Sequence, residues 1–309
     1  MIVQLLVAAG LGALLTTFVA QFIRPDASAE VMPPALSTLP AATVEPTELL
    51  LLPEPSIPPA TPPLVTATPL PLRLAVYQMD YVPILMYHYI RNVNAREDPL
   101  GYRLSVTPER FEEQMVWLRD NDYMPIRMGM LADCLRGLKD CPDNPVLITF
   151  DDGYKDSATA ALPILEQFGF PATFYIVTDF VGKPGYMAWE QIERLRDSDM
   201  EIGSHSVSHA DLAVVDLRTA RREIALSRVI LERRLGVPVR SFSYPAGSYT
   251  PVVAAMVHQA GYTSAVTTSP LTGFKHMYQL QRRRVLGGET IKGFPSYMTP
   301  VQLEEAIGP

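Results

Sequence analysis

Two kinds of hydrophobic pattern alternate along the chain from about residue 74 onward. Short apolar runs rich in β-branched and aromatic residues predict strands, and longer stretches with apolar residues at helical spacing predict helices. The predicted strands are 82–88, 145–152, 171–177, 200–206, 241–247, 263–268 and 278–286. The predicted helices between them are 107–121, 157–170, 188–199, 216–236 and 250–261.

This alternation predicts an α/β domain with a mostly parallel sheet. About seven strand–helix units favour a distorted (β/α) barrel of about seven parallel strands, although spacing alone leaves a doubly wound sheet open. In a barrel of this kind the functional side chains gather at the carboxyl ends of the strands. Catalytic and metal-binding side chains are therefore expected at the carboxyl ends of the predicted strands.

The chain begins with a different pattern. Residues 2–23 carry no charged side chain, and about 20 apolar residues are enough to cross a bilayer as a helix. Segment 1–24 is therefore predicted to be a transmembrane anchor, with a signal segment cleaved near Ala27-Ser28-Ala29 as the alternative. We expect a single-pass protein of the cell membrane with its domain outside the cytoplasm, or a secreted protein if the segment is cleaved.

Composition then divides the rest of the chain. Residues 25–73 are rich in proline, threonine and alanine and are interpreted as a disordered linker before a globular domain over 74–298 and a C-terminal tail over 299–309. A net charge of −7 gives no basic footprint for nucleic acid, and 48 % hydrophobic residues support a sizeable core. Cys134 and Cys141 could form a local disulfide outside the cytoplasm, whereas the lack of a Cys-x-x-Cys pair argues against a thiolate zinc site.

Several predicted strands end in polar side chains. Asp151 and Asp152 directly follow an apolar run, where adjacent like charges repel unless a metal ion or a shared proton lies with them. The alternative is that these carboxylates only cap the helix that begins near Ser157. Other strands end in His88, in His205 with His209 just beyond it, and in Tyr244-Pro245.

His205 and His209 are four residues apart, a spacing that on a helical turn places two imidazoles on one face. Such a pair is weak evidence alone, but with a carboxylate it offers three ligands to a divalent ion and leaves positions open for water and substrate. A second carboxylate that does not bind the ion can accept a proton from the attacking water. This division of roles would explain the adjacent aspartates.

Taken together, these residues resemble the polysaccharide deacetylases of the NodB-homology type, carbohydrate esterase family 4. TFDDGY at 149–154 resembles the first motif of the family, SHSVSH at 204–209 the second, and FSYPAGSY at 242–249 the third. The first two motifs in this order are specific, whereas the third alone would be weak. The resemblance covers roughly residues 80–290, and PILMYH is similar to an early strand of the poly-N-acetylglucosamine deacetylases.

The resemblance implies a metal-dependent hydrolase that removes acetyl groups from a GlcNAc-containing polysaccharide, an exopolysaccharide or a cell-wall glycan. It implies that Asp151 is the general base and that a divalent ion, most often Zn²⁺, is held by Asp152, His205 and His209. It also implies that a backbone N–H near Tyr244, at the turn with Pro245, stabilises the oxyanion formed when water attacks the acetyl carbonyl.

Two departures from the family pattern matter. Many members begin the third motif with an arginine that orients the base, and here that position is Ser243, with Arg240 three residues earlier. The late Leu-x-His motif that supplies a general acid is also absent. We predict that His88 is the general acid, with a structural histidine at the rim as the alternative.

Further residues receive weaker interpretations. Trp189 could line the substrate groove, although a tryptophan at the start of an amphipathic helix is more often part of the core. Tyr154 and Tyr249 could contact substrate. The arginines of 218–234 and of 282–284 are most simply solvated surface residues, with polyanion binding as the alternative. A glycan-binding pseudoenzyme and an O-acetyl esterase on the same barrel remain as alternative functions.

Overall fold

A computed structural model describes residues 81–268 and 276–300. The predicted membrane anchor, the linker and all but the first two residues of the predicted tail lie outside the described residues. No helix among the described residues is both long enough and apolar enough to cross a membrane.

Six parallel strands form most of one sheet, in the order β1, β5, β6, β7, β8, β9. Their bounds are Ile84–Tyr87, Pro145–Phe150, Thr173–Ile176, Glu201–Ser204, Ser241–Ser243 and Ser264–Thr267. Each strand pairs with the next in parallel register. The predicted strands are therefore confirmed, but they are shorter than predicted because their last residues belong to loops that carry the polar side chains.

The last predicted strand closes this sheet. It is divided into β10 (Leu280–Gln281), which pairs with β9, and β11 (Arg283–Arg284), which pairs with β1. Arg282 lies between the two, and its N–H donates to the Thr267 carbonyl at 3.2 Å. The sheet thus returns to its first strand, and the predicted near-closed parallel barrel is confirmed.

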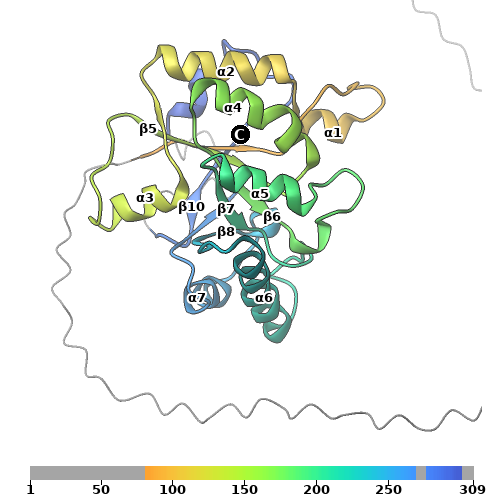
Figure 1. Cartoon of the computed structure of the whole chain (residues 1–309), viewed down its shortest axis with the longest axis vertical. Coiled ribbons are helices and arrows are strands. Elements are labelled where there is room, and N and C mark those ends of the chain that lie inside the picture. The colour runs from red at the N-terminus through yellow and green to blue at the C-terminus, as the bar shows by residue number, and fades with distance from the viewer. Residues whose placement is uncertain (1–80, 269–275, 301–309) are drawn as a thin grey trace, which may run out of the picture. The chain divides into compact units, whose positions relative to one another are not determined.

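Helices surround the strands (Figure 1). They are α1 (Pro99–Leu104), α2 (Pro108–Asp120), α3 (Met128–Leu135), α4 (Leu162–Phe168), α5 (Trp189–Asp197), α6 (Leu217–Leu235) and α7 (Pro251–Gln259). Side-chain caps fix several starts: Thr107, Asp216 and Thr250 each accept a hydrogen bond from the first turn of their helix. A π-helical turn, Ser157–Ala161, precedes α4 just before Pro163.

Smaller elements complete the fold. They are the short strands β2 (Tyr89–Ile90), β3 (Ser105–Val106) and β4 (Met124–Pro125), and the 3₁₀ turns Thr178–Phe180, Pro245–Gly247 and Phe294–Met298. Helices α1 and α3 were not among the predicted elements. Cys134 at the end of α3 forms a disulfide with Cys141.

The alternation of side chains along each strand positions the site. In β5, Val146, Ile148 and Phe150 belong to the core cluster beneath the helices, whereas Leu147 belongs to a second cluster inside the barrel. Because side chains alternate with a period of two, the inward series continues through Thr149 to Asp151. The base predicted from the sequence is therefore directed into the barrel mouth, while its neighbour Asp152 is turned toward the next loops.

Candidate active site

Three side chains converge where the chain leaves β5 and β7. The Nε2 atoms of His205 and His209 each lie 3.3 Å from Oδ1 of Asp152. One ligand atom of each residue lies within 4.8 Å of the other two, which suits three ligands around one ion. The structure therefore brings together the three residues predicted to hold a metal.

The hydrogen bonding of His205 tests whether these residues fit a cation. Its Nδ1 lies 2.8 Å from the carbonyl oxygen of Ser243, and because a carbonyl can only accept, Nδ1 carries the proton of the neutral ring. Nε2 then directs a lone pair at Asp152 Oδ1, which is buried and has no hydrogen-bond partner among the described residues. Two acceptors that face each other need a cation between them, so the group fits a divalent ion.

The pKa of His205 also indicates that a positive charge is favoured at this position. Burial lowers the pKa of this ring, but the carboxylates of Asp151 and Asp152 raise it above its ordinary value. Positive charge is therefore favoured at this point, and a bound divalent cation would supply it in place of a proton.

The two histidines do not lie on a helical turn, as their spacing had suggested. They lie on a loop after β7, and His209 itself has a φ of 63°. Glu223 of α6 fixes this loop, because its Oε2 accepts the N–H groups of Val207 and Ser208 at 2.9 and 2.7 Å. The buried Glu223 carboxylate therefore holds the two histidines in position, a role that the sequence analysis had given to a helical turn.

Asp152 also has an unusual backbone. Its φ of 69° is left-handed, and Gly153 follows at 78°. A non-glycine residue in this region costs about 1 kcal/mol or more, and such residues concentrate at functional sites. The helix-capping alternative is wrong, because the N-cap of the next helical turn is Asp156 and that turn has no side-chain cap.

Asp151 lies against a guanidinium inside the barrel. Arg282 donates from Nη1 to Oδ1 at 2.7 Å and from Nη2 to Oδ2 at 2.5 Å. The two side chains are only 4 % and 0 % exposed. Burial raises the pKa of Asp151, but the charge of Arg282 outweighs it and holds this pKa below its usual value. Asp151 is therefore ionised and able to accept a proton.

Arg282 is the site residue that the sequence interpretation missed. The run 282–284 had been interpreted as surface, yet Arg282 is buried at the break in the closing strand and also donates to Ser243 Oγ at 2.9 Å. The serine that stands where many relatives have arginine thus helps to hold an arginine from another strand. Arg240, the nearest arginine in sequence, instead pairs with Asp133 at the opposite end of the barrel.

His88 lies at the end of β1, on the strand next to β5. It is half-buried, and burial lowers its pKa, although the charges of Asp151 and Asp152 act in the opposite direction. These influences locate the imidazole near both carboxylates. Its role as general acid stays a prediction.

The structure narrows the choice of oxyanion donor near Tyr244. The N–H of Tyr244 donates to the Val266 carbonyl at 3.1 Å as part of the sheet, and Pro245 has no N–H. The next N–H belongs to Ala246, which is exposed, has a φ of 54°, and has no acceptor among the described residues. Ala246 is therefore the donor that this turn leaves free.

Two of the aromatic candidates, Tyr154 and Trp189, lie in different surroundings. Tyr154 follows Asp152 closely and stacks between Tyr89 and Tyr186. Trp189 starts α5 and packs, partly buried, against the core beneath the helices, and its ring faces Arg234 of α6 at 5.6 Å. This packing agrees with the core interpretation of Trp189.

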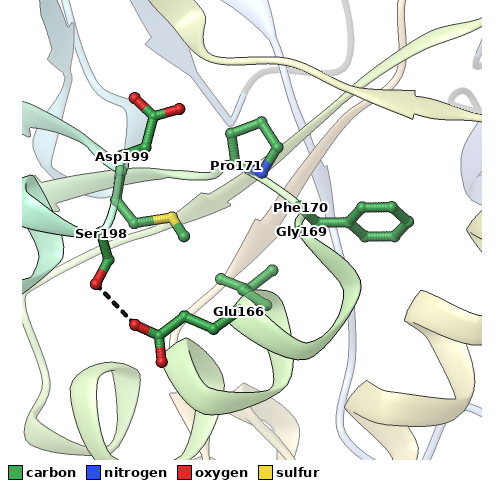
Figure 2. A pocket seen from close by; sticks show the side chains of 8 residues that line it. Glu166, Gly169, Phe170, Pro171, Ser198 and Asp199 are labelled. Carbon is green, nitrogen blue, oxygen red and sulfur yellow. Dashed lines mark hydrogen bonds between the residues drawn. The ribbon is translucent and has the colours of Figure 1, made fainter.

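A cavity of about 260 Å³ lies elsewhere, where the chain leaves α4 and where it enters β7 (Figure 2). Gly169 to Pro171 and Ser198 to Met200 line it, so it belongs to the amino ends of β6 and β7. Its polar groups satisfy each other, since Ser198 Oγ donates to Glu166 at 2.7 Å. The chemistry gathers instead at the opposite, carboxyl ends.

Fold and site together define a class: a parallel α/β barrel with a buried base and an Asp-His-His group at the carboxyl ends of its strands, as in barrel hydrolases. Comparisons with known proteins agree. A family model described as Polysaccharide deacetylase matches residues 139–265. YxkH of Bacillus subtilis (strain 168), which is named after this family, is 31 % identical over 219 residues, covering 70 % of this chain and 76 % of that protein. The chain belongs to the polysaccharide deacetylase family.

Other relatives are similar over different shares of their length. A poly-beta-1,6-N-acetyl-D-glucosamine N-deacetylase of Escherichia coli (strain K12) is 31 % identical over 119 residues, which are 33 % of this chain and 18 % of that protein. The structure of the Streptococcus pyogenes deacetylase PplD in complex with acetate matches with a TM-score of 0.65 at 25 % identity, over 71 % of this chain and 98 % of that chain.

Proposed function

We propose that this chain is a metal-dependent deacetylase that removes acetyl groups from a GlcNAc-containing polysaccharide. The observation that carries the proposal is the Asp-His-His group beside a separate, ionised carboxylate that is paired with Arg282. Binding alone would not require a base beside a metal-ligand group. The name of the Escherichia coli relative, a poly-beta-1,6-N-acetyl-D-glucosamine N-deacetylase, supports N-acetylglucosamine as the sugar.

The residues divide the reaction between them. Asp152, His205 and His209 would hold a divalent ion, for which zinc suits the two imidazoles, and the ion would polarise the acetyl carbonyl and the attacking water. Asp151 accepts the proton of that water, and Arg282 keeps it ionised for this role. The Ala246 N–H stabilises the oxyanion, and His88 protonates the leaving amine.

Arg282 bears on the pseudoenzyme alternative. A pseudoenzyme would fit the missing arginine of the third motif and the missing late histidine, but a guanidinium reaches the base from the closing strand. The O-acetyl esterase alternative uses the same attack on a carbonyl, so only the substrate distinguishes it.

Acetate release from a panel of N-acetylated and O-acetylated glycans tests the function. We expect the zinc-loaded protein to release acetate from N-acetylglucosamine oligomers, and Asp151→Asn to lose at least about 100-fold in rate while metal content is retained. His205→Ala with His209→Ala should lose both metal and activity. Undiminished release by that double variant would refute the metal site.

We further propose that the domain works outside the cytoplasm, attached to the membrane by segment 1–24. The uncharged segment, the proline-rich residues after it and the Cys134–Cys141 disulfide support this location. Cell fractionation and protease access in intact cells test it, because a domain in the cytoplasm would be protected.

A further inference from the structure

Four aromatic rings stand in a row beside the metal-ligand group. Tyr89 stacks on Tyr154 with centroids 3.7 Å apart, Tyr154 on Tyr186 at 5.1 Å, and Tyr186 meets Phe180 at 4.7 Å. Phe180 in turn lies 6.4 Å from the ring of His209. We call Tyr89, Tyr154 and Tyr186 the tyrosine wall.

The wall is assembled from three separate segments of the chain. Tyr89 begins β2, Tyr154 follows β5, and Tyr186 lies in the loop between β6 and α5. Backbone pairing fixes two of these segments together, since Lys155 donates to Gly185 and Met187 donates to Gly153, both at 2.9 Å. A row that joins three segments, two of them paired through their backbones, is a built surface rather than a chance contact.

The ring faces are already occupied. Arg91 covers the outer face of Tyr89 at 3.7 Å, and the inner faces stack on one another. The wall can therefore not offer its ring faces to a sugar, and it can offer only the edges and hydroxyl groups of half-buried rings. The usual stacking of a pyranose on an aromatic face is excluded here.

The hydroxyl groups have bonding capacity left over. Those of Tyr89 and Tyr186 both interact with the hydroxyl of Tyr154. A phenol hydroxyl carries one donor and can also accept, so the three hydroxyl groups offer donor and acceptor positions to a ligand.

The wall is also neutral and adjacent to the metal-ligand group. A tyrosine hydroxyl is uncharged at neutral pH. The row ends beside the metal-ligand group, because the ring of Phe180 lies 6.4 Å from that of His209. Such a row suits a neutral ligand with many hydroxyl groups better than a charged one.

We infer that the tyrosine wall binds the sugar next to the one that is deacetylated, and so selects a glycan chain over a single acetylated sugar. This inference rests on the proposed function, because it takes the acetyl group to lie at Asp152 and the histidines. With the acetyl group there, the chain continues along the row toward Tyr89 or Phe180. Sugar hydroxyl groups then form hydrogen bonds with the tyrosine hydroxyl groups at the edges of the rings.

The test compares a long substrate with a short one. Tyr89→Phe, Tyr186→Phe and the double variant keep the stacked rings and delete only hydroxyl groups. The two probes are an N-acetylglucosamine pentamer and 4-nitrophenyl acetate, which has an acetyl group but no sugar. For the pentamer we expect KM to rise about 3- to 10-fold for each single variant, with little change in kcat, and about 10-fold or more for the double variant.

The ratio of kcat/KM for the pentamer to that for the ester is the deciding quantity. It should fall in the Phe variants and stay at the wild-type value in Tyr123→Phe, a half-buried tyrosine that stacks on Trp117. An unchanged ratio in the double variant, with an unchanged Tm, would overturn the inference.

Direct binding separates this inference from the proposed function. If the wild-type protein releases no acetate from the pentamer, the proposed function fails, yet calorimetry with the pentamer still tests the wall. Binding that weakens in the double variant supports the wall, and absence of pentamer binding to the wild type refutes it.

Discussion

Replacing Arg282 by methionine would remove the cation that faces Asp151. Both side chains are almost fully buried, and the guanidinium also donates to Thr149 Oγ1 and Ser243 Oγ at 3.2 and 2.9 Å. Removing one partner of a buried ion pair typically costs about 3–5 kcal/mol, because the remaining charge is uncompensated. We therefore expect the free energy of unfolding to fall by an amount within this range.

The same change should alter the pH dependence of the reaction. In the folded protein the pKa of Asp151 is held below its usual value, so the ion pair stabilises the fold above the unfolded pKa of about 3.9 and loses this effect as pH falls through the folded pKa. Without Arg282, burial dominates and the pKa rises. An opposite charge at this range typically shifts a carboxyl pKa by about 1–3 units, so the acid limb of kcat/KM should move upward by that amount.

The assay is acetate release from pH 4 to 9 together with urea unfolding at pH 7. Arg283→Met is the matched control, because this neighbour donates to the backbone of Thr299 and Ser296 and does not reach Asp151. A second test moves the cation: Arg282→Ser with Ser243→Arg offers a guanidinium from the position that many relatives use. An Arg282→Met enzyme with wild-type stability and an unshifted acid limb would refute the assignment of Arg282 as partner of the base.

Three further predictions follow from other parts of the molecule. Removal of metal by a chelator should abolish acetate release and lower the Tm, and added zinc should restore both, because an ion that binds only the folded state stabilises it. A Tm that is unchanged by the chelator would contradict the metal site. Burial raises the pKa of Asp156 to about 6. The favourable contribution of this carboxyl group to stability is therefore present below the unfolded pKa of about 3.9 and is lost as pH rises through 6. Asp156→Asn should stabilise the protein at pH 7 by up to about 3 kcal/mol in urea unfolding, and this gain should vanish near pH 4. Cys134→Ser with Cys141→Ser opens a loop whose ends are 7 residues apart and should cost about 2–3 kcal/mol in the same measurement, whereas an unchanged midpoint would mean that the disulfide contributes nothing.

The barrel could be predicted because its signals are local. Each strand is a short apolar run, each helix has its own periodicity, and parallel strands bring their carboxyl ends to one rim. Asp152, His205 and His209 are therefore predictable as a group even though about 50 residues separate the aspartate from the histidines. The spacing of the histidines correctly predicted that they lie together, but it wrongly predicted a helical turn. Their loop is held by Glu223 from α6 and not by helical hydrogen bonds.

Arg282 could not be predicted, for a physical reason. Its sequence neighbours are two further arginines, and a run of three cations ordinarily indicates solvent. Only the closure of the sheet reveals that the strand breaks there, which places Arg282 inside and Arg284 outside. The particular donor near Tyr244 could not be assigned for a similar reason, because the Val266 carbonyl that accepts the Tyr244 N–H comes from a neighbouring strand that the local motif does not contain.

The position of Arg282 couples the closure of the barrel to the chemistry of its base. The closing segment pairs with β9 on one side of Arg282 and with β1 on the other, through only two residues each. The guanidinium at the break reaches β5 through Asp151 and β8 through Ser243. An arginine at position 243 would approach the Asp151 carboxylate from β8, so that ion pair would not depend on the last strand closing the barrel. Here the ion pair forms only when the last strand is in place, and because a buried unpaired carboxylate is costly, the same contact both holds the barrel shut and keeps Asp151 ionised.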